Sequence, residues 1–296
     1  MKFRLTIALL AGVFAGAAAA AHAPVVAPAA RAASPLTGAT QLLAMHAALE
    51  SKLAHNAFGR PLVLESQEGA RTVGGDVYAV VDYPFATVQH ALANARAWCD
   101  VLILHLNTKQ CRANGDSLAV RIGRKTAQDP ADAFGLTFAY RLESSSPGYL
   151  SAQVSAPTGP LGSHDYHIQL QAVPLGAHRS FLRLHYSYGF GEAAKFTSKG
   201  YFATSGNGKI GFTRVGKGYV GGMRGAVERN TMRYYLAVDS YLASLAQPPG
   251  RQFSSRIASW FDATEQYRAQ LHEIERADYL AMKQAEYANQ QATTLR

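Results

Sequence analysis

Cysteine and long apolar runs are both scarce in this chain. Only two cysteines occur in 296 residues, which argues against a framework of several disulfides and against a zinc site made of cysteine pairs. Beyond the first 21 residues, no stretch approaches the roughly 18 unbroken apolar residues of a transmembrane helix. We therefore expect no membrane span in the mature protein.

The first 23 residues have the layout of a secretory signal peptide. Lys2 and Arg4 precede an apolar run from Leu5 to about Ala20, and small residues that suit a peptidase follow. No cysteine follows the run, which excludes a lipoprotein anchor. An uncleaved membrane anchor is the alternative, since Leu5 to Ala21 is close to the lower length limit of a spanning helix. We expect cleavage of residues 1–23 and a periplasmic or secreted protein.

The rest of the chain has the composition of a packed globule with a basic surface. Residues 24–37 are rich in Pro and Ala and predict an unfolded tether. Over the whole chain 48% of the residues are hydrophobic, 17% are charged, and the formal net charge is +9. A basic surface can contact nucleic acid, anionic lipid headgroups or acidic ligands. Export disfavours nucleic acid, so an anionic membrane surface, an acidic ligand and a merely solubilising surface stay open.

Residues 38–60 predict a helix followed by a break. One helical face collects the apolar residues Leu42, Leu43, Met45, Leu49 and Leu53. The sequence "FGRP" then ends the helix. Two strand-like runs follow, "RPLVLESQ" and "GDVYAVVDYPF", and "ATVQHALANARAWCDVLI" returns to helical spacing.

The next part of the chain has the alternating pattern of strands. The turn signals "NGD", "SPG" and "GAH" separate three pairs of runs. In the last pair one face is apolar and aromatic, whereas the other carries Gln169, Gln171, Arg183 and His185. Successive hairpins with one apolar face predict an antiparallel meander. Glu192–Thr204 is expected to form a short helix, and "KIGFTRV" one further strand.

Two helical segments follow the strands. Gly222–Leu245 predicts a long helix with an apolar stripe of Val227, Thr231, Tyr234, Val238, Tyr241 and Leu245. Residues 251–296 predict a helical tail whose apolar residues recur at spacings of three and four as far as Ile274. We expect this tail to dock on its own chain. Contact with a partner, or self-association through residues 251–296, is the alternative.

This order of strand, helix, about six antiparallel strands and long helix is similar to the START-like superfamily, also called SRPBCC or helix-grip. The segment "GDVYAVVDYPFATVQHALANARAWCDVL" resembles its opening strand, turn and helix, and "VERNTMRYYLAVDSYLASL" occupies the place of its gripping helix. The similarity covers Pro61 to Leu245, and residues 61–247 are assigned to this domain. The whole chain also resembles a family of exported proteobacterial proteins with no established activity.

The resemblance implies an α+β fold in which a curved antiparallel sheet of about seven strands wraps around the long C-terminal helix. Superfamily members mostly bind lipids, sterols or other apolar small molecules between sheet and helix, and a minority catalyse cyclisation or hydrolysis. Tyrosines at the inward positions suit an amphipathic ligand, because they combine a ring with a hydroxyl. The candidate ligand-binding residues are Tyr140, Tyr166, Leu184, Tyr186, Tyr188, Val227, Thr231 and Tyr234. A core filled by the same residues is the alternative.

Cys99 and Cys111 predict a disulfide, the default for an isolated pair in an oxidising compartment. Closing a loop of this size stabilises a fold by about 3 kcal/mol. A metal site is disfavoured because His164 and His167, three apart on a strand, face opposite ways. A thiol nucleophile with a histidine base has nothing in the sequence to fix its geometry. We expect no metal, no cofactor and no catalytic residue.

The remaining motifs do not assign a reaction. "SHDYH" places Asp165 beside two histidines, but no serine has the G-x-S-x-G frame. "SGNGKIG" lacks the spacing of a phosphate loop. The charged group Arg224, Glu228, Arg229 and Arg233 predicts either a site for an anionic headgroup near the start of the gripping helix or surface ion pairs.

The sequence therefore predicts a non-catalytic protein that binds a hydrophobic or amphipathic, lipid-like molecule. A cyclase- or hydrolase-type enzyme is one alternative, with His105, Asp165 and His185 as the residues to test. An interaction module acting through the helical tail is the other.

Overall fold

The computed structural model describes residues 35–191 and 208–294. The expected signal peptide, nearly all of the expected tether and the short helix expected at Glu192–Thr204 lie outside the described residues. The residues from Ser34 onward belong to one unit of the chain, and the description below concerns this unit.

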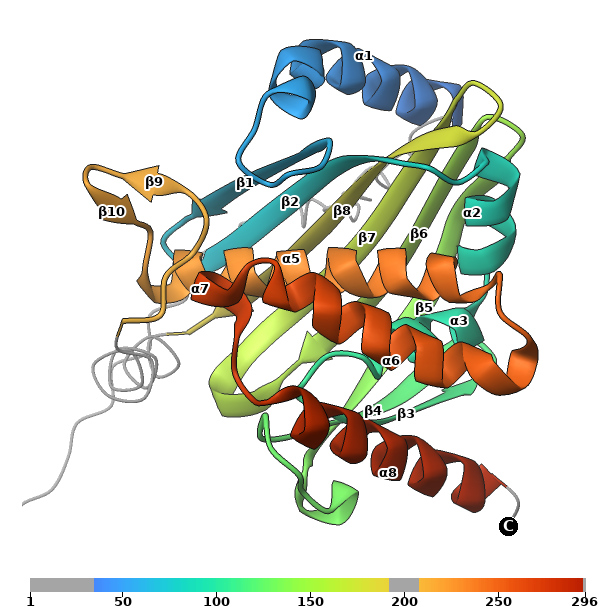
Figure 1. Cartoon of the computed structure of the whole chain (residues 1–296), viewed down its shortest axis with the longest axis vertical. Coiled ribbons are helices and arrows are strands. Elements are labelled where there is room, and N and C mark those ends of the chain that lie inside the picture. Colours follow the sequence, from blue (N-terminus) through green and yellow to red (C-terminus); the bar gives the residue numbers. More distant parts are fainter. Residues whose placement is uncertain (1–34, 192–207, 295–296) are drawn as a thin grey trace, which may run out of the picture. The chain divides into compact units, whose positions relative to one another are not determined.

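Eight antiparallel strands form the main sheet, one more than the sequence predicts, in the order β1-β2-β8-β7-β6-β5-β4-β3 (Figure 1). The strands span β1 Leu62–Glu68, β2 Thr72–Val81, β3 Thr108–Asn114, β4 Ser117–Ile122, β5 Phe134–Ser146, β6 Tyr149–Thr158, β7 Ser163–Leu175 and β8 Arg179–Phe190. Strands β3 to β8 are joined in sequence as a meander, and β8 closes back onto β2. Gly115 and Gly176 adopt positive φ in the turns after β3 and β7, which glycine does without steric cost.

One predicted strand is wrong. Of "KIGFTRV", only Arg214–Val215 (β9) is a strand, and it pairs with Gly218–Tyr219 (β10) in a separate ribbon. The preceding backbone is held by the buried Glu228, whose Oε2 accepts hydrogen bonds from the amides of Phe212 at 2.5 Å and Thr213 at 2.9 Å. A side chain therefore satisfies the amides that a sheet partner would otherwise bond.

Helices cover both faces of the sheet. They span α1 Pro35–Ala54, α2 Phe85–Leu92, α3 Ala95–Leu102, α5 Gly222–Ser244, α6 Pro249–Glu265, α7 Arg268–Leu271 and α8 Arg276–Thr294. The helix expected after β2 is two helices, because Asn94 is extended and its side chain accepts the Ala97 amide to begin α3. α5 lies across the inner face of the sheet, with α6 packed on its other side (Figure 1). This sheet, gripping one long helix, is an α+β fold of the helix-grip type.

The alternation of each strand produces two separate cores. Inward residues such as Val77, Ala79 and Leu184 join α5, α6 and α8 in the main core. Outward residues Tyr78 and Phe181 form a smaller core with α1. Among the described residues, no helix combines the length and the hydropathy that crossing a membrane requires.

The helical tail docks on its own chain. Tyr279 donates from its hydroxyl to the carbonyl of Leu104 at 2.9 Å, and Trp260 donates from its indole to the carbonyl of Arg233 at 3.0 Å. The Gln290 side chain accepts the Cys111 amide at 2.9 Å. The tail is broken into α6, α7 and α8. It packs on α5, on α3 and the loop that follows it, and on β3.

The predicted disulfide is confirmed. Cys99 of α3 is bonded to Cys111 of β3, and their Cα atoms are 5.1 Å apart. The bond ties α3, which follows β1, β2 and α2 in the chain, to the edge strand at the opposite end of the sheet from β1.

Candidate ligand site

Four tyrosines meet between the sheet and α5. Tyr166, Tyr186 and Tyr188 come from the inner face of β7 and β8, and Tyr234 comes from α5. The ring centroids are 5.4 Å apart for Tyr166 and Tyr188, and 5.2 Å apart for Tyr186 and Tyr234. We call these four residues the tyrosine cluster. It unites four of the eight predicted ligand-binding residues.

Three of the four tyrosines in the cluster are partly exposed. Tyr166, Tyr188 and Tyr234 keep accessible surface, although burial raises the pKa of each phenol above its usual value. Tyr186, by contrast, is only 5% exposed, and burial raises its pKa well above the usual value.

The hydroxyls of the tyrosine cluster differ in their partners. Tyr166 donates to Ser163 Oγ at 2.7 Å, and Tyr186 is hydrogen-bonded to Asn230. Within residues 35–191 and 208–294, the hydroxyls of Tyr188 and Tyr234 have no hydrogen-bond partner. Unpaired hydroxyls among aromatic rings can orient a ligand that carries one polar group.

His105 places a neutral polar group beside the tyrosine cluster. Its ring stacks on Tyr234 with centroids 5.0 Å apart, and its Nε2 lies 3.4 Å from Oδ1 of Asn230. Nδ1 accepts the Asn107 amide at 3.2 Å, so Nε2 carries the proton. Burial first, and then the charges of Arg233, Lys283 and Lys125, lower the pKa of His105 well below its usual value.

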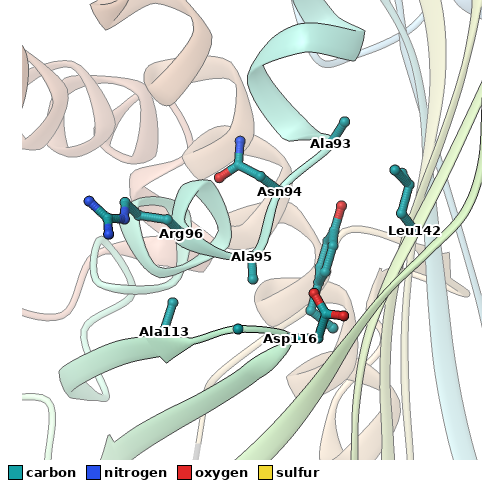
Figure 2. Close-up of a pocket in the computed structure, with 9 residues that line it drawn as sticks. Ala93, Asn94, Ala95, Arg96, Ala113, Asp116 and Leu142 are labelled. Atoms are coloured by element: carbon teal, nitrogen blue, oxygen red, sulfur yellow. The ribbon is translucent and has the colours of Figure 1, made fainter.

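The other four predicted residues occupy different places. Leu184, Val227 and Thr231 have no accessible surface, and Thr231 donates to the carbonyl of Val227 at 2.8 Å. Tyr140 lines a pocket of about 390 Å³ between α3, β3 and β5. Figure 2 shows Arg96, Asn94 and Asp116 around this pocket. No other residue of the predicted set lines it.

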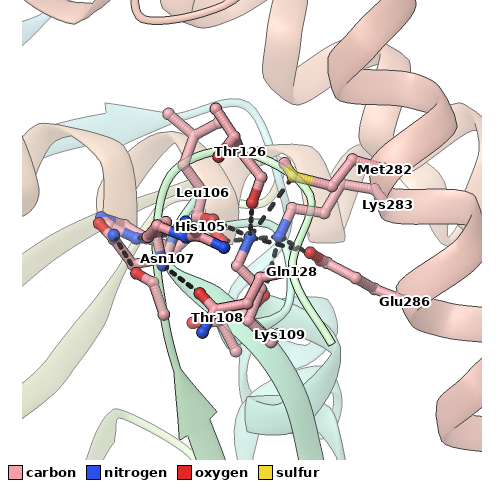
Figure 3. A network of polar contacts seen from close by, with 12 residues as sticks. His105, Leu106, Asn107, Thr108, Lys109, Thr126, Gln128, Met282, Lys283 and Glu286 are labelled. Carbon is pink, nitrogen blue, oxygen red and sulfur yellow. Dashed lines mark hydrogen bonds and ion pairs between the residues drawn. The ribbon is translucent and has the colours of Figure 1, made fainter. Parts of the chain in front are cut away.

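Two buried ion clusters were missed by sequence reasoning. The closed cluster consists of Lys109 of β3 with Lys283 and Glu286 of α8, whose side chains are 0%, 0% and 5% exposed (Figure 3). Lys109 donates to the carbonyls of Leu106 and Thr126 and to Glu286 Oε1 at 2.9, 3.0 and 3.0 Å. Lys283 donates to the carbonyls of His105 and Thr108 and to Glu286 Oε2 at 2.8, 2.9 and 2.7 Å. Every ammonium donor is therefore occupied.

The open cluster surrounds Glu273, in the loop between α7 and α8. Glu273 Oε1 accepts Arg233 at 2.9 Å and also pairs with Lys125, and Oε2 pairs with Lys209 at 2.5 Å. Burial raises the pKa of Glu273, but the charges of Arg233 and Lys125 outweigh it and hold the value at about 2. Lys125 and Lys209 are 25% and 30% exposed in their side chains, so solutes can reach both.

The charged residues expected at the start of the gripping helix are not one surface patch. Arg224 is half-buried and donates to Ser66 Oγ at 2.7 Å, and Glu228 is fully buried. Arg229 donates to the carbonyl of Ile210 at 3.0 Å. These bonds connect α5 to β1 and to the segment before β9, which is a structural role.

The three residues considered for an enzyme do not meet. His105 is inside the core, whereas Asp165 is exposed at the start of β7 and bonds His164 at 2.8 Å. His185 lies on the outer face of β8. There its Nδ1 lies 3.0 Å from Asp76 Oδ1, and its Nε2 lies 3.0 Å from Ser187 Oγ. Among the described residues, no three His, Cys, Asp or Glu side chains are grouped to hold a metal ion.

The sheet and its gripping helix define the chain as an α+β protein of helix-grip type, and several solved structures share parts of this arrangement. No family model and no curated protein matches the chain. Human StAR-related lipid transfer protein 5 is 10% identical over 72% of this chain and 100% of its own, with a TM-score of 0.34. A conserved protein from Geobacillus kaustophilus is 10% identical over 57% and 95%, with a TM-score of 0.34. Norcoclaurine synthase from Thalictrum flavum, in complex with dopamine and hydroxybenzaldehyde, is 12% identical over 49% and 80%, with a TM-score of 0.31. Similarity at this level transfers neither ligand nor activity.

Proposed function

We propose that this chain is an exported START-like protein that binds a hydrophobic or amphipathic, lipid-like molecule between the sheet and α5 without changing it. The observation that carries the proposal is the tyrosine cluster, in which accessible rings surround two hydroxyls without partners among the described residues. An apolar lining with a few polar groups is what small-molecule sites present.

Export is part of the same proposal. The layout of residues 1–23 supports it, and so does the Cys99–Cys111 disulfide, because structural disulfides persist mainly in oxidising compartments. Membership of the exported proteobacterial family that the sequence resembles belongs to the proposal too.

The test is to purify the full chain from its own host and identify bound molecules by native mass spectrometry and lipid extraction. We expect a co-purifying amphiphile and a rise in melting temperature with a panel of lipids. Empty protein together with no shift across the panel would overturn the proposal.

A double variant tests whether the ligand binds at the tyrosine cluster. Tyr188→Phe with Tyr234→Phe keeps both rings and removes both hydroxyls, so affinity for an amphiphile should fall about tenfold if two ordinary hydrogen bonds are lost. Tyr287→Phe is the control, because Tyr287 stacks on Phe253 at 3.8 Å in the tail. Equal loss in both variants would show that the tyrosine cluster is not the site.

Ester hydrolysis is a second candidate function, favoured by the Ser187, His185 and Asp76 chain on the outer face. In this reaction Ser187 Oγ would attack an ester carbonyl while His185 Nε2 takes its proton and returns it to the departing alkoxide, and water would then release the acyl group. A fluorophosphonate probe should then label Ser187, and His185→Gln should abolish the labelling. Ser151→Ala is the control and should leave the labelling unchanged. The Ser151 hydroxyl bonds Glu143 and has no histidine partner in the described chain. No labelling of Ser187 would remove this candidate.

A further inference from the structure

The open cluster has hydrogen-bond capacity that the closed cluster lacks. A lysine ammonium has three donors. In the closed cluster Lys109 and Lys283 use all three. Lys125 and Lys209 each use one, on Glu273, and neither has another hydrogen-bond partner in the described part of the chain. Among the described residues, each partly exposed lysine therefore leaves two donors without an acceptor.

The charges of the open cluster also favour an anion. Lys125, Lys209 and Arg233 surround a single carboxylate, that of Glu273. Like charges held this close disfavour one another, and burial together with the charge of Arg233 lowers the pKa of Lys125 to about 7 despite Glu273. A bound anion would relieve the repulsion and accept the spare donors.

The open cluster is connected to the tyrosine cluster by direct contacts. Arg233 donates to Asn230 Oδ1 at 3.4 Å, and His105 Nε2 lies 3.4 Å from the same oxygen. Asn230 is also hydrogen-bonded to Tyr186, and His105 stacks on Tyr234. Asn230 and Arg233 lie about one turn apart on α5. The Asn230 side chain therefore lies between Arg233 of the open cluster and the aromatic residues of the tyrosine cluster.

We infer that Lys125 and Lys209 bind the anionic group, a carboxylate or a phosphate, of an amphiphile whose apolar part lies against the tyrosine cluster. The inference rests on the proposed ligand binding and adds the charge of the ligand. Arg233 and Glu273 position the two lysines and do not need to touch the ligand.

Calorimetric titration of the full chain with decanoate, decyl phosphate and decanol tests the inference. The three share one alkyl chain, so the difference between them reports the head group. We expect the preferred anion to bind at least about tenfold more tightly than the alcohol, the ratio that 1.4 kcal/mol produces. In the double variant Lys125→Gln with Lys209→Gln, the alcohol should bind as before and the preference should disappear.

Lys217→Gln is the matched control, because Lys217 is an exposed lysine in the turn between β9 and β10 and should keep the preference. Equal affinity for anion and alcohol, or a preference that survives the double variant, would overturn the inference while leaving ligand binding intact. Binding of none of the three would count against the proposed function itself. Acetate or inorganic phosphate binding as tightly as the amphiphiles would also overturn the inference, since the lysines would then form an independent anion site.

Discussion

The closed and open clusters hold the same kinds of groups and differ in what surrounds the ammonium nitrogens. In the closed cluster, carbonyls of the loop and strand after α3 and of the loop after β4 occupy every donor that Glu286 leaves. In the open cluster, Glu273 is the hydrogen-bond partner that the described residues offer to Lys125 and Lys209. A buried charge whose donors are all satisfied stabilises an interface between elements, whereas one with spare donors is prepared for a ligand. The comparison separates a structural ion cluster from a candidate binding site within one protein.

Glu286→Gln should have the largest effect, because it removes the carboxylate that pairs with two fully buried lysines. Breaking a buried pair costs about 3–5 kcal/mol. Urea unfolding of the variant measures this loss directly. Glu275→Gln is the control, since the Glu275 side chain is 73% exposed, and it should change stability little. If Glu286→Gln lowers the free energy of unfolding no more than Glu275→Gln does, the closed cluster does not stabilise the fold.

Removal of the disulfide should cost about 3 kcal/mol in the chain-entropy model. Cys111 shares β3 with Lys109, so the bond holds the strand on which the closed cluster is built. Cys99→Ser with Cys111→Ser can be compared with the wild-type chain in urea, with and without a reductant. The reductant should destabilise the wild type to the level of the variant and leave the variant unchanged.

Acid should lower the free energy of unfolding by about 3 kcal/mol through the protonation of Glu273. The pKa of Glu273 is about 2 in the folded chain and near 4.5 when unfolded, so the unfolded state binds the proton first. The stabilisation by Glu273 is therefore complete above pH 4.5 and is lost as the pH falls from there to 2. The free energy of unfolding, measured at a series of pH values, should show this loss in the wild type and lack it in Glu273→Gln. Parallel curves would mean that Lys125, Lys209 and Arg233 do not hold this carboxylate ionised.

Lys125→Met should have the smallest effect, with stability at pH 7 within about 1 kcal/mol of the wild type, because Glu273 keeps Arg233 and Lys209 as partners and the Lys125 side chain is 25% exposed. The pKa of Lys125 is about 7 in the folded chain against 10.5 unfolded. Between these two pH values the unfolded wild type binds more protons than the folded wild type. The free energy of unfolding of the wild type should therefore rise with pH relative to that of the variant. Thermal unfolding at pH 7 and pH 9 measures the change, and a large loss at pH 7 would make the open cluster structural as well.

The parts of the fold that the sequence predicts are those with a local pattern. Alternation in residues such as Tyr166, Ile168 and Leu170 indicates a strand with one apolar face, and that face is inward in the structure. The isolated cysteine pair indicates the disulfide. The break at Asn94 has a local cause too, a helix cap, but helical spacing on both sides conceals it.

The ion clusters could not be predicted because their partners are distant in sequence. Lys109 is 177 residues from Glu286, and Lys125 is 148 residues from Glu273. Lys283 and Glu286, three apart on α8, look in the sequence like a solvated pair on a helix surface. The ligand-binding residues were also not predictable from local spacing alone. Spacing places Thr231 on the apolar stripe of α5, but it does not show that Thr231 packs against Gly75 of β2.

The closed cluster also sets an order in which the chain can fold. Lys109 reaches its carboxylate only through α8, so the ammonium and the neighbouring carbonyls stay hydrated until that helix docks. Contacts of such long sequence separation form late, because the entropy of closing the intervening loop opposes them. The strands between β3 and β8 can therefore pair as local hairpins while the chain emerges. The arrival of α8 is the step that dehydrates the far end of the sheet and commits the domain to its final packing.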